Sequence, residues 1–293
     1  MRRCDTASVF PARFTIAFAL LLCAPAAPAI AAPIPHGTLE LFAENSWVTP
    51  GHDFSLGLHF QLEKGWHIYW INPGDSGEPP RVTWQLPNGL TAAPIQWPVP
   101  RRLGTSSIVD FGYQDAVMLL VPMHADASLA TKTPAQIAGE VKLLVCRELC
   151  VPGKAQLSLT LPVNPEAPVP EARTRDLFAA TRKSLPRPAP ARWSFRVDDT
   201  KDSFELIASG GSHIASAAFF PLAESQIDNS APQKVVPRAA GFRLTLRKSD
   251  QLLKPIQHLN GVLVLSADRA YVIDAPVGEH AAAGASASGV GSH

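Results

Sequence analysis

The sequence contains little charge. Only 17% of its 293 residues are Asp, Glu, Lys or Arg, whereas an average soluble protein has about 25%. The formal net charge is +1 and no long basic run occurs, which excludes the electrostatic footprint of a nucleic-acid-binding protein. Hydrophobic residues make up 46% of the chain. That share excludes a mostly disordered protein and is enough for a packed core.

The high proline content disfavours long helices. The chain has 28 prolines, about double the usual share. Proline breaks helix interiors but is tolerated at strand edges and in turns. The composition therefore argues against an all-helical protein. The length predicts one large domain or two of ordinary size.

Only the N-terminus carries a long apolar run. The ten-residue run Phe14–Cys23 follows a segment with three arginines, and Ala29-Ile30-Ala31 is a small-x-small cleavage pattern. Ten residues cannot span a bilayer, which needs about 20. We predict a secretory signal peptide over residues 1–31, export to the periplasm and no membrane span after cleavage. A lipoprotein acylated at Cys23 is the alternative, against which Leu22 argues.

Cysteine is scarce as well. Two of the four cysteines lie in the predicted signal peptide, so the mature chain keeps only Cys146 and Cys150. In an exported protein such a pair meets an oxidising compartment. The β-rich sequence around the pair favours a hairpin or a tight turn, in which the two Cα atoms come close enough for a disulfide.

Three roles for this pair stay open. A redox-active pair would exchange through mixed disulfides, with Arg147 and Lys154 favouring a thiolate and Glu148 opposing it. A structural disulfide would be a weak staple, because closing so short a loop removes little entropy from the unfolded chain. A metal site lacks a second pair of ligands, because none of the nine histidines has zinc-motif spacing from the cysteines.

Short strands dominate residues 36–163. Apolar residues alternate with small or polar ones along Phe54–Leu62, a period of two. Turn sequences such as Pro87-Asn88-Gly89 separate the runs. The pattern predicts an antiparallel sandwich. The expected strands are Leu39–Glu44, Phe54–Leu62, His67–Trp70, Val82–Leu86, Ile95–Trp97, Val117–Met123, Gln136–Val145 and Ala155–Leu161.

A second series of strands follows a Pro-rich linker. The linker covers residues 164–192. It is predicted to contain one short helix over Glu171–Ser184, with Pro170 directly before it, that docks on a neighbour through Leu177 and Phe178. Residues 193–278 are predicted to form a smaller sandwich, with a long loop at Leu222–Ala240, and residues 279–293 a disordered tail. The expected strands are Trp193–Val197, Phe204–Ala208, Ala215–Phe220, Phe242–Arg247, Val262–Ser266 and Tyr271–Ile273.

Two aromatic segments are candidates for a site. On the strand that holds Trp66, Ile68 and Trp70, these three residues share one face, and His67 and Tyr69 share the other. Core packing suits the first face, and the second face could line a site. The segment Asp110–Asp115 is predicted to be a short aromatic loop, either a packed corner or a lid over a reactive group.

Three segments together resemble the N-terminal periplasmic domain family of the disulfide interchange reductase DsbD. They are Gly65–Trp70 with the loop Asn72–Gly77, then Asp110–Tyr113, then Val145–Pro152. Phe219-Phe220-Pro221 and Gly261-Val262-Leu263 are similar to the second domain of the ScsB-like (copper-sensitivity suppressor) branch. The resemblance extends over about residues 36–278.

The resemblance implies two tandem immunoglobulin-like sandwiches and a redox-active cysteine pair. Cys150 is implied to form the mixed disulfide with partners, and Cys146 to be its internal partner. A cap loop is implied to shield the pair, and it corresponds to Asp110, Phe111, Gly112 and Tyr113. His67 and Tyr69 are similar to aromatic positions beside the family's cysteines, although a histidine departs from the family pattern.

The resemblance further implies electron relay without a cofactor. The expected partners are thioredoxin-like periplasmic oxidoreductases and a separately encoded membrane disulfide reductase, because the family's transmembrane and thioredoxin-like domains do not follow in this sequence. Two other functions stay open. One is a non-enzymatic interaction module with a permanent disulfide. The other is copper handling by the reduced dithiol, since soft thiolates select Cu(I).

Overall fold

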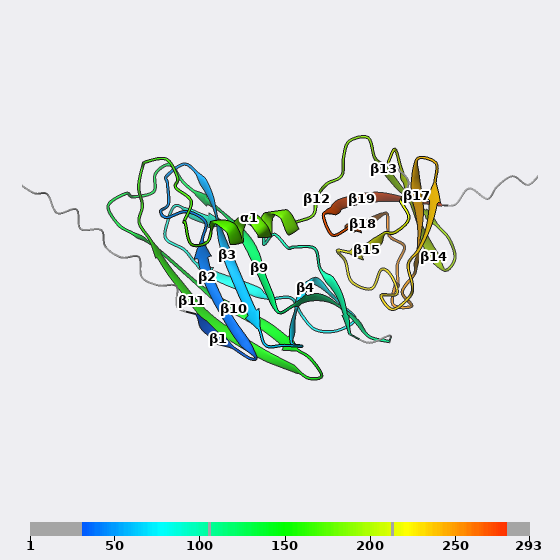
Figure 1. Ribbon diagram of the computed structural model, residues 1–293, viewed down its shortest axis with the longest axis horizontal. Coiled ribbons are helices and arrows are strands. Elements are labelled where there is room, and N and C mark those ends of the chain that lie inside the picture. Colours follow the sequence, from blue (N-terminus) through cyan, green and yellow to red (C-terminus); the bar gives the residue numbers. More distant parts are fainter. Residues whose placement is uncertain (1–30, 105–106, 212–213, 280–293) are drawn as a thin grey trace, which may run out of the picture.

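The computed structural model describes residues 31–104, 107–211 and 214–279. The predicted signal peptide and C-terminal tail lie outside these ranges, except for their terminal residues Ala31 and Glu279. Strands form most of the described chain (Figure 1). Their bounds are β1 Ala32–Ile34, β2 Gly37–Ala43, β3 Asp53–Leu62, β4 His67–Gly74, β5 Arg81–Gln85, β6 Leu90–Ala92, β7 Arg101–Gly104, β8 Val109–Gln114, β9 Ala116–Ala125, β10 Ala135–Cys146, β11 Cys150–Leu161, β12 Arg187–Pro188, β13 Ser194–Asp199, β14 Ser203–Ser209, β15 Ala218–Pro221, β16 Lys234–Arg238, β17 Gly241–Arg247, β18 His258–Ser266 and β19 Arg269–Glu279.

The first eleven strands form the N-terminal sandwich. One sheet has the order β1-β2-β3-β9-β6, and the other has the order β11-β10-β4-β8-β7 with β5 beside β10. Alternate residues of β3, including Leu56, Leu58 and Phe60, are fully buried between the sheets together with Ile68 of β4. The predicted period of two is therefore confirmed, because one face of each strand supplies the core.

The later strands form the C-terminal sandwich. Its strands follow the path β15-β18-β19-β13-β14-β17-β16, with β12 also paired to β19. Strand β19 links the two halves of this path, because it pairs with β18 in the antiparallel sense and its last residues pair with β13 in the parallel sense. The all-β prediction of two sandwiches is confirmed, with these parallel pairings as an addition.

The linker is fixed to the N-terminal sandwich. Its helix α1 spans Arg175–Ser184 and begins after Thr174, four residues later than the predicted Glu171. The Thr174 hydroxyl donates a hydrogen bond to the Ala43 carbonyl of β2, which ties the start of the helix to this strand. Phe178 is 2% exposed and packs on Met118 and Leu120 of β9, so the predicted docking is confirmed. No helix in the described ranges has the length and apolarity to cross a bilayer.

Three local predictions were wrong. The segment Asp110–Asp115 is not a loop, because most of it belongs to strand β8 between β4 and β7. The predicted loop Leu222–Ala240 contains edge strand β16, whose exposed side chains lack an apolar pattern. Ile95–Trp97 forms only an isolated bridge between Gln96 and Leu120.

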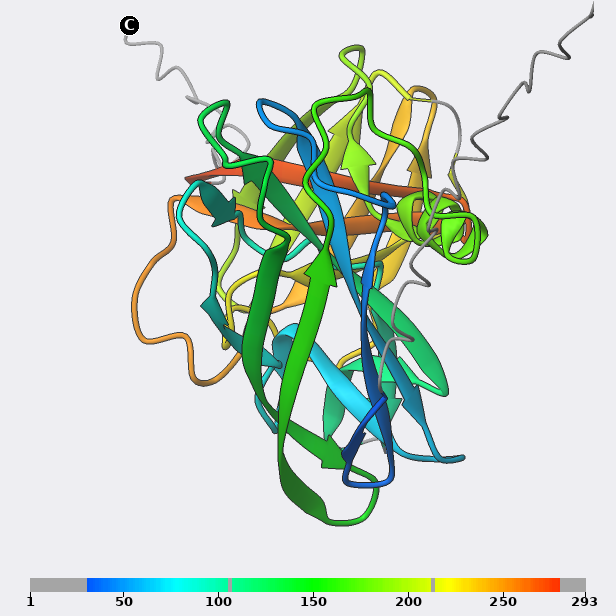
Figure 2. The same cartoon turned by 90° about the vertical axis from the view of Figure 1, so that its left-hand side faces the viewer.

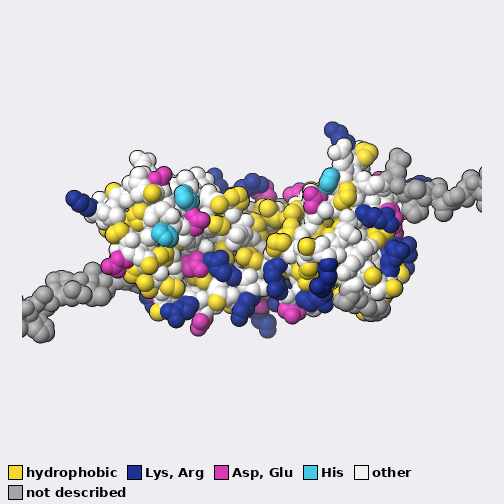
Figure 3. Space-filling model, turned by 90° about the horizontal axis from the view of Figure 1, so that it is seen from above, with side chains coloured by type: hydrophobic (Ala, Val, Ile, Leu, Met, Phe, Trp, Pro, Cys, Tyr) yellow, Lys and Arg dark blue, Asp and Glu magenta, His cyan; other side chains and the backbone are white. Residues whose placement is uncertain are grey.

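The two sandwiches lie end to end along the long axis of the molecule (Figure 1), so that one lies behind the other when the molecule is seen from its end (Figure 2). Phe220 of β15 and Val262 of β18 belong to the same buried cluster as the core of the N-terminal sandwich. Side chains fill the junction on the face shown in Figure 3, where the surface continues from one sandwich to the other. The C-terminal sandwich therefore meets the N-terminal one through buried residues.

Candidate functional site

The two cysteines close the end of a long hairpin. Strands β10 and β11 pair in register from Ala135–Leu161 up to Cys146–Cys150. A three-residue turn, Arg147–Leu149, joins the two cysteines. Their Cα atoms are 4.1 Å apart and their sulfur atoms form a disulfide. The hairpin favoured from the sequence is the geometry observed.

The two cysteines differ in exposure. Cys146 is only 2% exposed, whereas Cys150, the first residue of β11, is exposed. Leu149, directly before Cys150, is 76% exposed. This difference bears on exchange, since exchange requires access to the sulfur that is attacked.

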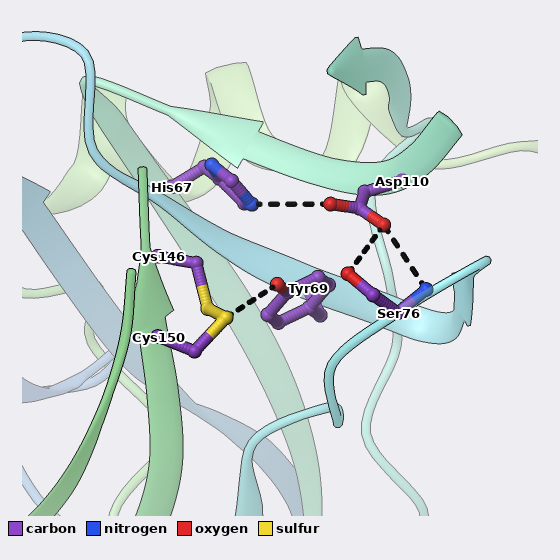
Figure 4. Close-up of a disulfide and its surroundings, with 6 residues drawn as sticks. All are labelled: His67, Tyr69, Ser76, Asp110, Cys146 and Cys150. Atoms are coloured by element: carbon purple, nitrogen blue, oxygen red, sulfur yellow. Dashed lines mark hydrogen bonds and ion pairs between the residues drawn. A yellow bond between two sulfur atoms is a disulfide. The ribbon is translucent and has the colours of Figure 1, made fainter. Parts of the chain in front are cut away.

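Strand β4 passes behind the disulfide. His67 pairs with Cys146 in the sheet register, and Tyr69 lies two residues further along on the same face. The Tyr69 hydroxyl is 3.4 Å from Cys150 Sγ (Figure 4). Because a disulfide sulfur has no hydrogen, the hydroxyl is the donor. On the other face, Trp66 and Trp70 lie in the hydrophobic core, as the alternation predicted.

A buried carboxylate lies on the far side of Tyr69. Asp110 Oδ1 accepts hydrogen bonds from the Ser76 amide and hydroxyl at 3.1 and 2.9 Å. Its Oδ2 is 3.7 Å from His67 Nε2 (Figure 4). His67 and Asp110 are each 6% exposed. The site thus holds a carboxylate, Asp110, and an imidazole, His67, on the strands beside the disulfide, and both groups are shielded from bulk water.

Burial raises the pKa of the Tyr69 hydroxyl. The negative charge of Asp110 acts in the same direction, and a hydrogen bond with Ser76 opposes both. Tyr69 is therefore neutral at physiological pH and keeps the proton that it donates toward sulfur. If Cys150 becomes a thiolate, the same hydroxyl can stabilise its charge.

A glycine-containing loop covers the Tyr69 ring. Gly77 has φ +82°, and a Cβ at this position would lie 2.1 Å from Tyr69 Cζ. Only a residue without a side chain allows the loop to approach the ring so closely. Sequence reasoning missed Ser76 and Gly77 as parts of the site. Their segment, Asn72–Gly77, was the available signal, because it is one of the segments that carry the family resemblance.

The expected cap residues lie in other places. Phe111 and Tyr113 belong to the core cluster, and the Tyr113 hydroxyl donates to the Pro98 carbonyl at 2.7 Å. Gly112 pairs with Tyr69 across the sheet, where a Cβ would lie 2.1 Å from the Ile68 carbonyl oxygen. These three residues are strand residues rather than a cap loop, because β8 is an inner strand. Only Asp110 of the four faces the site.

The expected cationic groups contact other partners. The Arg147 guanidinium lies over the Trp66 ring, 5.0 Å from its centroid. Lys154 forms an ion pair with Glu140 at 2.7 Å, four residues beyond Cys150 along β11. Within the described ranges, no group of three His, Cys, Asp or Glu residues is arranged to hold a metal ion.

The N-terminal sandwich is similar to a known family. Residues 40–162 match the model of the family described as thiol:disulfide interchange protein DsbD, N-terminal. The match contains β4, β8 and the cysteine hairpin, and therefore every residue of the site above. No curated protein matches the sequence.

Solved structures extend the likeness to both sandwiches. The crystal structure of the N-terminal periplasmic domain of ScsB from Proteus mirabilis matches with a TM-score of 0.62 and 16% identity, covering 84% of this chain and 94% of that one. At this identity the match shows a shared fold alone. Domains 5–6 of the S-layer protein SbsC give a TM-score of 0.20 with 10% identity, covering 82% of this chain and 98% of that one, and carry no argument.

Proposed function

Because residues 40–162 form a DsbD N-terminal-like, ScsB-like domain, we propose that this protein exchanges its Cys146–Cys150 disulfide with thiols of other proteins. The observation that supports it best is the asymmetry of the pair. Cys150 is exposed and Cys146 is 2% exposed. One sulfur is available for attack, and the other is protected as the resolving thiol.

The exchange proceeds in two steps. A thiolate of a donor dithiol attacks Cys150 Sγ, the bond between the two sulfurs breaks, and Cys146 leaves as a thiolate. The donor's second thiolate then attacks the donor's first sulfur, which is bonded to Cys150 in the mixed disulfide, and the Cys150 thiolate is released. The donor becomes a disulfide, and two electrons pass to the protein. Protonation of the released thiolates by solvent completes the dithiol.

Delivery to an acceptor is the reverse reaction. The Cys150 thiolate attacks the disulfide of an oxidised partner, and Cys146 resolves the mixed disulfide. The Tyr69 hydroxyl, 3.4 Å from Cys150 Sγ, supports the negative charge on the attacking sulfur. The acceptors proposed are thioredoxin-like periplasmic oxidoreductases and the donor proposed is a membrane reductase, and the predicted signal peptide supports the compartment.

The reduction potential of the pair tests this proposal. The protein is equilibrated in graded dithiol buffers, and free thiols are trapped with a mass tag. We expect a value of about −200 to −270 mV, because labile disulfides lie above the roughly −300 mV typical of structural ones. A value well below −300 mV would instead indicate a permanent disulfide in an interaction module.

Mixed-disulfide trapping supplies a matched pair of variants. Cys146→Ala leaves the exposed Cys150 thiol without its resolving partner, so a complex with an oxidised thioredoxin-like protein should accumulate. Cys150→Ala leaves only the buried Cys146 thiol and should form no complex. Equal trapping by both variants would contradict the assignment of Cys150 as the partner-facing sulfur.

A further inference from the structure

The loop that covers the redox site is also part of the contact between the two sandwiches. On one side, Ser76 binds Asp110 and Gly77 lies against the Tyr69 ring. On the other side, Asn72 and Asp75 form hydrogen bonds with the C-terminal sandwich. The two sets of contacts lie within six residues of each other, so a shift of one set moves the other.

Asn72 is the stronger of the two anchors. It is 1% exposed, and its Nδ2 donates to the Pro221 carbonyl at 2.8 Å and the Ala223 carbonyl at 3.2 Å. Its Oδ1 accepts a hydrogen bond from the Gly74 amide at 3.0 Å. One amide group therefore shapes the turn of the loop and ties it to β15 at the same time.

Asp75 is the second anchor. Its Oδ1 accepts a hydrogen bond from Asn229 Nδ2 of the C-terminal sandwich at 2.8 Å. Its Oδ2 accepts from the Val109 amide at 2.7 Å, at the start of the strand that carries Asp110. The guanidinium of Arg102 donates in turn to the Asn229 carbonyl. The carboxylate thus joins the loop, strand β8 and the second sandwich.

An apolar contact reinforces these bonds. Phe220 of β15 packs against Trp70 and Phe111, with ring centroids 6.3 and 5.1 Å apart. Trp70 is on β4 and Phe111 is on β8, the two strands that carry Tyr69 and Asp110 into the site. The C-terminal sandwich therefore contacts the loop and both strands behind the disulfide.

We propose that the C-terminal sandwich is a positioning element for the redox site, which fixes the loop Asn72–Gly77 so that Gly77 holds the Tyr69 ring against Cys150. The proposal rests on the exchange proposed above and assigns a role to the second sandwich. Through this loop the second sandwich limits how a partner thiolate reaches Cys150 Sγ. Asn72 and Asn229 are positioning residues, because they touch neither sulfur.

Three variants test the contact. Asn72→Asp keeps the oxygen that accepts the Gly74 amide and places a carboxylate against two carbonyls of the second sandwich. Asn229→Ala removes the bond to Asp75 from the opposite side and leaves the loop sequence unchanged, so it also serves if Asn72→Asp does not fold. Asn164→Asp is the matched control, since Asn164 Oδ1 likewise accepts an amide two residues on, from Glu166 at 3.0 Å.

Two measurements are made on the oxidised protein. The first is hydrogen exchange of the segments 72–78 and 109–114, whose amides include the Ser76 and Val109 donors. The second is the rate of reduction by dithiothreitol. In Asn72→Asp, hydrogen exchange of these segments and the rate of reduction should both rise. The rate of reduction should rise roughly tenfold, which corresponds to about 1.4 kcal/mol of lost hydrogen bonding. Asn229→Ala should give a smaller rise, and Asn164→Asp none.

A double-mutant cycle separates positioning from general loosening. Tyr69→Leu removes the ring through which the loop is argued to act, so adding Asn72→Asp to it should raise the reduction rate no further. Additive effects, or faster exchange without faster reduction, would overturn the proposal. So would unchanged exchange and reduction in both interface variants. The proposed function is decided separately, by the potential of the unmodified pair and its reaction with a thioredoxin-like protein.

Discussion

Replacing Tyr69 with Phe removes a single hydroxyl from beside the disulfide. In the oxidised protein this hydroxyl donates to a neutral sulfur 3.4 Å away. In the reduced protein it would face the Cys150 thiolate, a charged acceptor. Hydrogen bonds to charged groups contribute about 1.5–3 kcal/mol and neutral ones about 1 kcal/mol. The substitution should therefore destabilise the thiolate form by about 0.5–2 kcal/mol more than the disulfide form.

This difference fixes the sign and the size of the change in potential. For a two-electron couple about 30 mV corresponds to 1.4 kcal/mol, so Tyr69→Phe should lower the potential by roughly 10–40 mV where the thiolate predominates, near pH 9. Near pH 5 the thiols are neutral and the shift should vanish. Tyr69 keeps its proton near pH 9, because burial and the charge of Asp110 raise its pKa and the Ser76 hydrogen bond only opposes them.

The assay compares thiol–disulfide equilibria of the variant and the unmodified protein at both pH values. Tyr113→Phe is the matched control, because it removes a hydroxyl that donates to the Pro98 carbonyl at 2.7 Å within the core. That control should leave the potential unchanged at both pH values. The reasoning is refuted if Tyr69→Phe shifts the potential equally at both pH values, raises it, or shifts it no more than Tyr113→Phe does.

Two further predictions concern the scaffold. Phe178→Ala should lower the free energy of unfolding by about 3–5 kcal/mol, because it empties a buried site beneath α1. Urea unfolding measures this loss. A loss below about 1 kcal/mol would mean that the helix does not pack on β9 as observed. Burial raises the pKa of Tyr113 well above its ordinary value, so the folded state favours the neutral phenol. The resulting stability is fully present below about pH 10 and is lost as the pH rises through the folded-state pKa. Tyr113→Phe should make the alkaline decline of unfolding free energy shallower, and an unchanged decline would contradict this assignment.

The parts of the fold that the sequence predicts are those where local pattern and burial agree. Along β3 large apolar residues alternate with small or polar ones and line the core between the sheets, and the cysteine hairpin is framed by two long strands. The pattern fails for β8 because this strand is buried on both faces, and Asp110 is held there by Ser76 rather than exposed. It fails for β16 because an exposed edge strand needs no apolar face.

The candidate site, too, could be predicted from the sequence only in part. The cysteine spacing and the alternation on β4 were enough to place Tyr69 and the hairpin as candidates. The cover formed by Gly77 depends on a close approach between a loop and a ring, and the bond between Asp75 and Asn229 joins residues 154 positions apart. Neither contact leaves a periodic trace in the sequence, since the first joins a loop to a strand of the same sandwich and the second joins the two sandwiches.

The same hairpin also argues against a structural role for the disulfide. Cys146 and Cys150 form the last register pair of a ladder that continues down to Ala135–Leu161, so the strands are already aligned without the sulfur bond. In the chain-entropy model, closing a loop of roughly five residues contributes only about 2 kcal/mol to stability. A variant with both cysteines replaced by Ala should therefore remain folded and lose no more than about 2 kcal/mol in urea unfolding. A variant that loses its fold at 25 °C, about room temperature, would show that the bond maintains the sandwich and would favour an interaction module over exchange.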